Sequence, residues 1–426
     1  MSAQAVQADL TWIDGRFEHG VRIECGVDGR ISSVVRDCRE SPTHPGMAVL
    51  PGFVNSHSHA FQRALRGLGE RFPGDREDFW TWREAMYGLV DSMDASRMHA
   101  LCVSAFTEMR RAGITSVGEF HYLHHPDDDR WSGDRIVLEA AREAGIRIVL
   151  LQAHYVSGGF GEALQGGQRR FDTSDPDTFW RAFDRASSLC TPGQTMGVVG
   201  HSIRAVPVEQ LIELHEESRR RDLVFHMHVE EQPAEIEACQ ATCGCTPTGL
   251  LLDRLRLDER FTAVHDTHTL PSELEAFLAQ GSNVCLCPLT EANLGDGLPA
   301  REVLQRFPEQ ICVGSDSNSR ISMLEELRML ELAHRLQGRC RGVWADENGA
   351  IDRRLMDMAT INGARSLGLD VGRIVEGAWA DLALVDLQAD VLQHVAPESL
   401  GAALVLGVDR EVFVDTCVGG RWGRMD

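Results

Sequence analysis

The sequence predicts an α/β fold, a (β/α)8 TIM barrel joined to a small β-sandwich domain. Three observations lead to this prediction. Short apolar segments alternate with helical segments, ionisable residues follow most of the apolar segments, and strand-like sequence lies at both ends of the chain. Alternation of this kind indicates βα units with parallel strands, and eight such units close a barrel.

The eight expected strands lie between residues 48 and 315. They are residues 48–54, 114–119, 146–153, 196–200, 223–229, 261–265, 282–287 and 311–315. The intervals between them have helical periodicity, and several end at a glycine, as at Gly113, Gly145 and Gly281. Glycine directly after a helical segment is a common stop signal. The order strand, helix, strand therefore persists through the central three quarters of the chain.

Both ends of the chain have a different pattern. Asp14-Gly15 and Asp28-Gly29 separate short strand-like segments and are hairpin-type turns. Strand-like sequence returns after about residue 370. We expect residues 1–48 and 370–426 to pair into one β-sandwich domain beside a barrel domain of residues 49–369.

Composition excludes several functions. The chain has 42 basic residues against 64 acidic ones, a net charge of -22, and none of the basic residues is lysine. Schiff-base chemistry, a P-loop lysine and a carbamylated lysine between two metal ions are therefore excluded. The acidic balance argues against nucleic acid or an anionic membrane as a partner. A small anionic substrate would have to be held by arginines placed around its site.

The sequence also favours a cytoplasmic location. Residues 1–20 lack a basic and then apolar leader, and no apolar run approaches the roughly 18 residues of a membrane span. The twelve cysteines are scattered, and we expect buried reduced thiols. A disulfide, or a small structural metal site at the cluster Cys239, Cys243 and Cys245, is the lesser alternative.

Histidines recur where the expected strands end, and barrel enzymes build their active sites at that end of the barrel. One such histidine is usually structural, but recurrence after six of eight strands indicates a functional site. These histidines are His57, His59, His121, His154, His201, His226, His228 and His265. Acidic residues join them after the fifth, seventh and eighth strands, at Glu231, Glu291 and Asp316.

The first pair predicts a metal site. His57 and His59 are two residues apart, so both side chains leave the same face of a strand. With His228 and Asp316 they would form a mixed nitrogen and oxygen ligand set that suits one divalent ion, above all Zn²⁺, with a position open for water. His226 competes with His228 for the ligand role, and a histidine cluster without catalytic function is the alternative.

The motifs at these positions resemble the amidohydrolase superfamily. They are PGFVNSHSH after the first strand, His228 with Glu231 three residues on, His265, VGSDS around Asp316, and EGAWADLALVDL near the end of the chain. Binuclear members often use a carbamylated lysine, which this chain lacks. The resemblance therefore implies the mononuclear, deaminase-like subtype. It also implies that Asp316 accepts a proton from water, Glu231 donates one to the substrate, and His265 stabilises the tetrahedral intermediate.

Longer motifs resemble the formimidoylglutamate deiminase family of histidine degradation. They are HSHAFQRALRGL, DFWTWREAMYGLV, GEFHYLHH, HSIRAV, HMHVEEQ and CPLTEANLGDG. The resemblance implies a homodimer and a set of substrate-binding residues: Gln62, Arg83, Tyr122, His201 and Arg204. Glu230, Asp266 and Asn318 depart from the family pattern. The alternatives are a mononuclear aminohydrolase for a guanidino acid or nucleobase, and a metal-binding scaffold without catalysis.

Overall fold

A computed structural model describes residues 4–70 and 79–423, and in it eight parallel strands form one curved sheet. The strands are β6 (Phe53–Ser58), β7 (Ile114–His121), β8 (Arg147–His154), β9 (Gln194–Gly200), β10 (Phe225–Val229), β11 (Phe261–His265), β12 (Asn283–Leu286) and β13 (Ile311–Val313). Each strand pairs with the next along the chain, and a parallel bridge between Ser58 and Asp316 joins the first to the segment after the last. The predicted barrel is confirmed.

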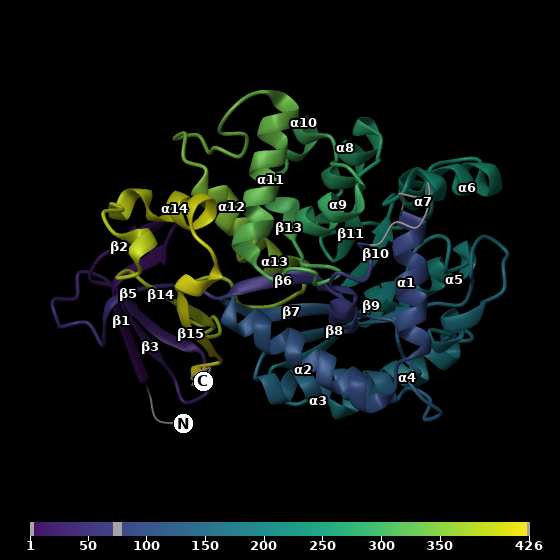
Figure 1. Cartoon of the computed structure of the whole chain (residues 1–426), viewed down its shortest axis with the longest axis horizontal. Helices are drawn as coiled ribbons and strands as arrows, with labels where there is room; N and C mark the ends of the chain where they lie inside the picture. The colour runs from purple at the N-terminus through teal and green to yellow at the C-terminus, as the bar shows by residue number, and fades with distance from the viewer. Residues whose placement is uncertain (1–3, 71–78, 424–426) are drawn as a thin grey trace.

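Helices surround this barrel (Figure 1). They are α1 (Phe79–Asp91), α2 (Ala95–Arg111), α3 (Ser132–Ala144), α4 (Pro176–Leu189), α5 (Val208–Arg220), α6 (Pro233–Cys243), α7 (Pro247–Arg254), α8 (Pro271–Ala279), α9 (Pro288–Leu294), α10 (Arg301–Leu304), α11 (Met323–Gly338), α12 (Asp352–Met358) and α13 (Ile361–Ser366). Gly145 ends α3 in the left-handed conformation, as its sequence position predicts. Apolar residues such as Val117, Leu151 and Val264 are fully buried, as parallel strands covered on both faces require.

Strands from both ends of the chain form the second sheet, at the left of Figure 1. They are β1 (Gln4–Ile13), β2 (Arg16–Glu18), β3 (Arg22–Cys25), β4 (Ile31–Val35), β5 (His44–Pro51), β14 (Leu382–Asp386), β15 (Phe413–Val418) and β16 (Arg421–Gly423). β14 lies antiparallel to β5, which lies parallel to β1. Helix α14 (Leu400–Gly407) precedes β15. The expected association of the two chain ends in a small β domain is confirmed.

The expected first strand, residues 48–54, is divided between the two sheets. Its first part ends β5 at Pro51, and its last part begins β6 at Phe53. Gly52 lies at the crossing, where an added Cβ would come within 2.2 Å of the Thr115 side chain. β6 then continues to Ser58, so His57 lies inside the strand and not after it.

Two further expectations concern the whole molecule. No helix of the described residues is long and apolar enough to cross a membrane. All twelve cysteines lie in the described part of the chain as free thiols.

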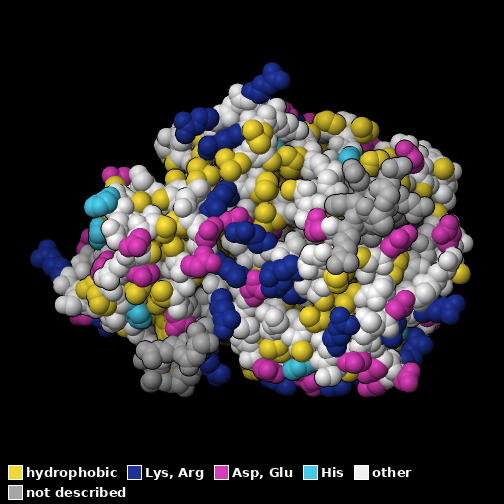
Figure 2. Space-filling view, viewed as in Figure 1, with side chains coloured by type: hydrophobic (Ala, Val, Ile, Leu, Met, Phe, Trp, Pro, Cys, Tyr) yellow, Lys and Arg dark blue, Asp and Glu magenta, His cyan; other side chains and the backbone are white. Residues whose placement is uncertain are grey.

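Figure 2 shows arginine side chains interleaved with acidic ones along the boundary between the small domain at the left and the barrel.

Candidate active site

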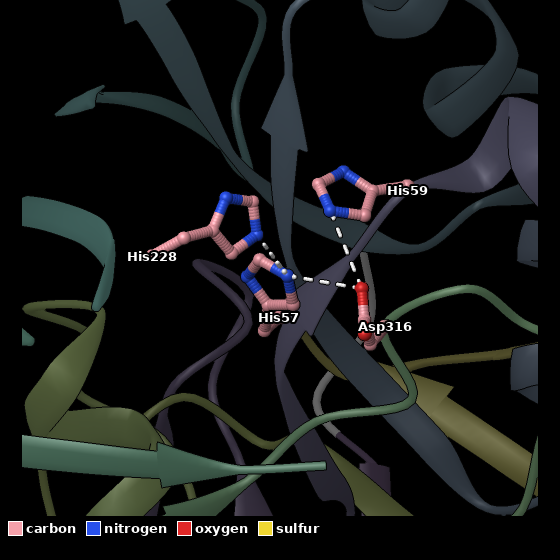
Figure 3. A group of neighbouring side chains, drawn as sticks. All are labelled: His57, His59, His228 and Asp316. Atoms are coloured by element: carbon pink, nitrogen blue, oxygen red, sulfur yellow. Dashed lines mark hydrogen bonds and ion pairs between the residues drawn. The ribbon is translucent and has the colours of Figure 1, made fainter. Parts of the chain in front are cut away.

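Four donor atoms meet at the carboxyl ends of the barrel strands (Figure 3). His57 Nε2 and His59 Nε2 each lie 3.3 Å from Asp316 Oδ1, and His228 Nε2 lies 3.3 Å from His57 Nε2. All four side chains are buried. The residues expected to bind metal are therefore brought together at one point.

These separations fit a bound metal ion. Ligand atoms about 2.0–2.1 Å from a tetrahedral Zn²⁺ lie roughly 3.3–3.4 Å from one another. Burial lowers the pKa of His59 to about 3 and lowers the pKa of His228 well below its ordinary value. A neutral imidazole is the form that binds metal. The donor set and its protonation thus suit a divalent ion.

A second histidine cluster, beyond the end of β7, has different geometry. His121 Nε2 and His124 Nδ1 lie 3.0 and 2.8 Å from Asp134 Oδ1, which are hydrogen-bond distances. His124 Nε2 is 2.8 Å from the carbonyl oxygen of Ala153. We interpret this cluster as a buried polar network, with hydrogen bonds at His124 and an ion-pair contact at His121, that ties the end of β7 to α3.

The remaining strand-end histidines do not join the metal ligands. His154 contacts Gln210 and Thr173, and His226 lies 2.9 Å from the carbonyl oxygen of Ser366. Of the two histidines on β10, it is His228 whose Nε2 lies 3.3 Å from His57 Nε2, so His228 and not His226 joins the ligand cluster.

Backbone pairing fixes Asp316 against the first two ligands. Asp316 N donates to His57 O at 3.0 Å, and His59 N donates to Asp316 O at 2.9 Å. Asp316 itself has a φ of 45°, an uncommon conformation for a residue with a side chain. Asn318 stabilises this turn, since its Nδ2 donates to Ser58 Oγ and its Oδ1 accepts from Ser315 Oγ. This departure from the family pattern therefore has a structural role.

Glu231 and His265 lie beside the metal ligands. His265 Nε2 is 3.8 Å from Glu231 Oε1 and 3.9 Å from Asp316 Oδ2. Burial raises the pKa of Glu231, which favours a protonated carboxyl group. Burial alone would lower the pKa of His265, but Glu231, Glu291 and Asp316 together raise it to about 10. Because Glu231 and His265 act on each other's charge, the pair together can hold a proton beside the four clustered donors.

Glu291 is a site residue to which the sequence assigned no role. Its Oε1 lies 3.3 Å from His265 Nδ1 and accepts a hydrogen bond from Cys287 N at 2.8 Å. It therefore fixes the orientation of the imidazole ring. The sequence feature that could have identified Glu291 as a site residue is its position directly after the seventh expected strand.

The cavity above the four clustered donors is lined by the expected substrate-binding residues. Its lining includes Gln62, Arg83, Tyr122, His201, Arg204 and all three tyrosines of the chain. Gln62 Nε2 donates to Tyr122 Oη at 2.6 Å, and Arg83 Nε donates to Tyr87 Oη at 2.8 Å. Two arginines and three tyrosines therefore line one cavity.

Glu235, on α6, is a second residue that the sequence did not single out. Its carboxylate Oε1 lies 3.6 Å from Arg204 Nε, and neither of its oxygens has a hydrogen-bond partner. Burial raises the pKa of Glu235 to about 7. It supplies the counter-charge of Arg204 from behind the cavity lining.

The other two departures from the family pattern lie outside the cavity lining. Glu230 Oε1 accepts a hydrogen bond from Thr248 N at 2.9 Å, at the start of α7. Asp266 Oδ1 accepts one from Thr269 Oγ1 at 3.1 Å, in the turn after β11. Both are buried and stabilise local turns.

Fold and site together define the class of protein. The chain belongs to the amidohydrolase family, whose sequence pattern matches residues 48–422, and it is a hydrolase of that superfamily. Among its relatives is the formimidoylglutamate deiminase of Pseudomonas aeruginosa, 36% identical over 98% of this chain and 94% of that protein. A 5-methylthioadenosine/S-adenosylhomocysteine deaminase of Halobacterium salinarum is 28% identical over 86% of this chain and 83% of that protein.

Solved structures agree. An amidohydrolase from Brucella melitensis superposes with a TM-score of 0.90 and 33% identity, covering 98% of this chain and 94% of that one. An adenosine deaminase from Xanthomonas campestris with bound zinc gives a TM-score of 0.81 at 21% identity, covering 98% and 92%. At 21% identity, the similarity to the Xanthomonas campestris enzyme is one of fold alone. The resemblance inferred from the motifs is confirmed.

Proposed function

We propose that the protein is a formimidoylglutamate deiminase. It hydrolyses N-formimidoyl-L-glutamate to N-formyl-L-glutamate and ammonia, a step of histidine degradation. One observation carries the proposal: a cluster of four donors suited to a metal ion adjoins a cavity that three of them line together with a buried glutamic acid and two arginines. The 36% identical relative supports the same substrate.

The metal would be held by His57, His59, His228 and Asp316, with one divalent ion, Zn²⁺ by preference, per chain. Bound there, it supplies a water molecule whose pKa is lowered toward neutrality. Asp316 has a second oxygen, Oδ2, on the side of His265. This oxygen accepts the proton that water loses as it attacks the formimidoyl carbon.

Glu231 and His265 act on the substrate's nitrogen and on the developing charge. The protonated Glu231 donates to the imino nitrogen, which converts the C=NH group to an amine in the tetrahedral intermediate. His265 donates a hydrogen bond from Nε2 to the newly bonded oxygen, while Glu291 holds its other nitrogen. Asp316 passes the proton taken from water to this nitrogen, the C–N bond breaks as ammonia leaves, and the hydroxyl proton of the intermediate returns to Glu231, which restores both residues.

Arg83 and Arg204 hold the two carboxylates of the glutamate moiety. A guanidinium group can bind a carboxylate through two parallel hydrogen bonds, which fixes orientation as well as position. Gln62, Tyr122 and His201 supply further hydrogen bonds. The net charge of -22 makes these arginines decisive, because the rest of the chain repels a dianion.

A substrate panel tests the proposal. Metal-replete protein should release ammonia from N-formimidoyl-L-glutamate, and a chelator should abolish the release. Turnover only of a guanidino acid, or of a nucleobase compound such as 5-methylthioadenosine, would favour the second function. No turnover of any compound would favour a metal-binding scaffold. We also propose that the protein is cytoplasmic and forms a homodimer. Sedimentation of the purified protein would test the homodimer.

A further inference from the structure

A second cavity, of about 720 Å³, lies at the opposite end of the barrel from the metal centre. The last turns of α2 and α3, the start of β8 and the turn between β15 and β16 surround it, in the lower centre of Figure 1. Its lining includes five arginines: Arg110, Arg111, Arg142, Arg147 and Arg421. Only two carboxylate residues, Asp28 and Glu143, line it with them. Asp381, outside the lining, pairs with Arg147, so Arg110 and Arg142 are the arginines that matter most for an added anion.

Arg110 is a buried cation that is bound only by neutral groups. Its side chain donates to Thr416 Oγ1, to Thr416 O and to the carbonyl oxygens of Ala144 and Gly145. The residue is 5% exposed, and burial lowers the pKa of Arg110 below its ordinary value, although the charges of Asp415 and Asp381 act in the opposite direction. Among the described residues, no carboxylate forms an ion pair with it. Burying such a charge is costly, and an anion bound beside it would reduce that cost.

Arg147 adds a second fixed guanidinium group. Asp381 accepts hydrogen bonds from its Nε and Nη2, and these leave Nη1 on the side of Gly193. The two buried arginines are therefore held rigidly, one by backbone carbonyls and one by a carboxylate.

Glycines border both guanidinium groups. A Cβ at Gly423 would lie 2.7 Å from Arg110 Nη2, and one at Gly193 would lie 3.9 Å from Arg147 Nη1. Gly193 has a positive φ, which accounts for a glycine there, but Gly423 does not. Any side chain at Gly423 would meet the edge of Arg110. Glycine at this position lets β16 pass close to the guanidinium group.

Arg142 lies at the solvent-exposed side of the cavity. It lies in the last turn of α3, is exposed and lines the same cavity. The neighbouring Glu143 faces His99, whose Nε2 lies 3.4 Å from its Oε2. A guanidinium group can bind a carboxylate or phosphate group through two parallel hydrogen bonds, so buried and exposed arginines around one cavity suit an oxyanion.

We propose that this cavity binds a small anion with two or more negative charges, carried by carboxylate or phosphate groups. The ligand would lie between the barrel and the small β domain and would link them. Because the cavity is at the far end of the barrel, the ligand does not compete with substrate.

Isothermal titration calorimetry on the metal-replete protein tests the proposal with two probes, inorganic phosphate and glutarate. Sodium chloride at equal ionic strength gives the baseline. The charge reversal Arg142→Glu should weaken binding of the preferred probe roughly tenfold or more, because a like charge would then face the anion. Arg256→Glu, at an exposed position outside the cavity, is the matched control and should leave binding unchanged.

Anions can also bind at the active site, so Arg204→Met serves as a second control. Binding that persists in Arg204→Met and is lost in Arg142→Glu supports the site. Phosphate alone would then identify a phosphate-bearing ligand, and glutarate alone a dicarboxylate. Binding of neither probe above the chloride baseline would overturn the proposal, as would binding that Arg142→Glu does not change.

Discussion

Replacing Arg204 by methionine removes the guanidinium group while keeping most of the side chain's volume. The Arg204 side chain is 17% exposed, so little solvent can replace the lost donors. In the proposed complex Arg204 and a substrate carboxylate form a buried, hydrogen-bonded charge pair, and removing one partner of such a pair costs about 2–5 kcal/mol. At about 1.4 kcal/mol per tenfold change, kcat/KM for N-formimidoyl-L-glutamate should fall roughly 30- to 5,000-fold.

Glu235 complicates this experiment, because Arg204→Met also leaves a buried carboxyl group without its counter-charge. The single variant should therefore lose stability as well as activity. In the double variant Arg204→Met/Glu235→Gln the stranded charge is removed. Its midpoint of thermal unfolding should recover, while kcat/KM should remain low.

A coupled assay for ammonia, read at several substrate concentrations, measures the effect. Arg254→Met, at an exposed position, is the matched control and should behave as the parent protein. An unchanged kcat/KM in Arg204→Met would refute the assignment of this arginine. Recovery of activity in the double variant would also refute it, since the loss would then come from folding.

Three further predictions concern single residues. Glu231→Gln should lower kcat by about 10²–10⁴, the usual contribution of a general acid or base, whereas Glu398→Gln at an exposed position should not; a kcat within a factor of two of the parent would exclude proton donation. Glu291→Gln should lower kcat more than it raises KM, because it frees the His265 ring without touching substrate; an effect on KM alone would contradict this. Burial lowers the pKa of His215 to about 4. The unfolded state then binds the extra proton first, so stability should fall between about pH 6.5 and 4. His215→Leu should reduce that fall by up to about 3 kcal/mol in urea unfolding, and an equal fall in both proteins would argue against it.

Much of the fold followed from local pattern. Eight buried parallel strands are nearly continuous apolar runs, so their number and order can be counted from the sequence. The two-residue spacing of His57 and His59 likewise places both imidazoles on one face. Gly52 shows the limit of this reasoning. The apolar run across it is continuous, and only the pairing partners on each side divide it between two sheets.

The parts of the site that the sequence did not predict depend on contacts between distant segments. Glu235 lies on α6 and pairs with Arg204, which follows β9, and no local pattern connects the two. From the sequence, Asn318 could be described only as a departure from the family pattern. Its hydrogen bonds with Ser58 and Ser315, which the structure shows, give it a structural role. Residue types and spacing identify ligands on one strand, whereas partners across the barrel need the fold.

Titrating metal into metal-free protein, while following ammonia release from N-formimidoyl-L-glutamate, tests the central claim most directly. Activity should rise in proportion to added Zn²⁺ and reach its plateau at one equivalent per chain. A plateau that requires two equivalents would contradict the single four-donor centre. A fully loaded protein that releases no ammonia from this substrate would contradict the proposed function.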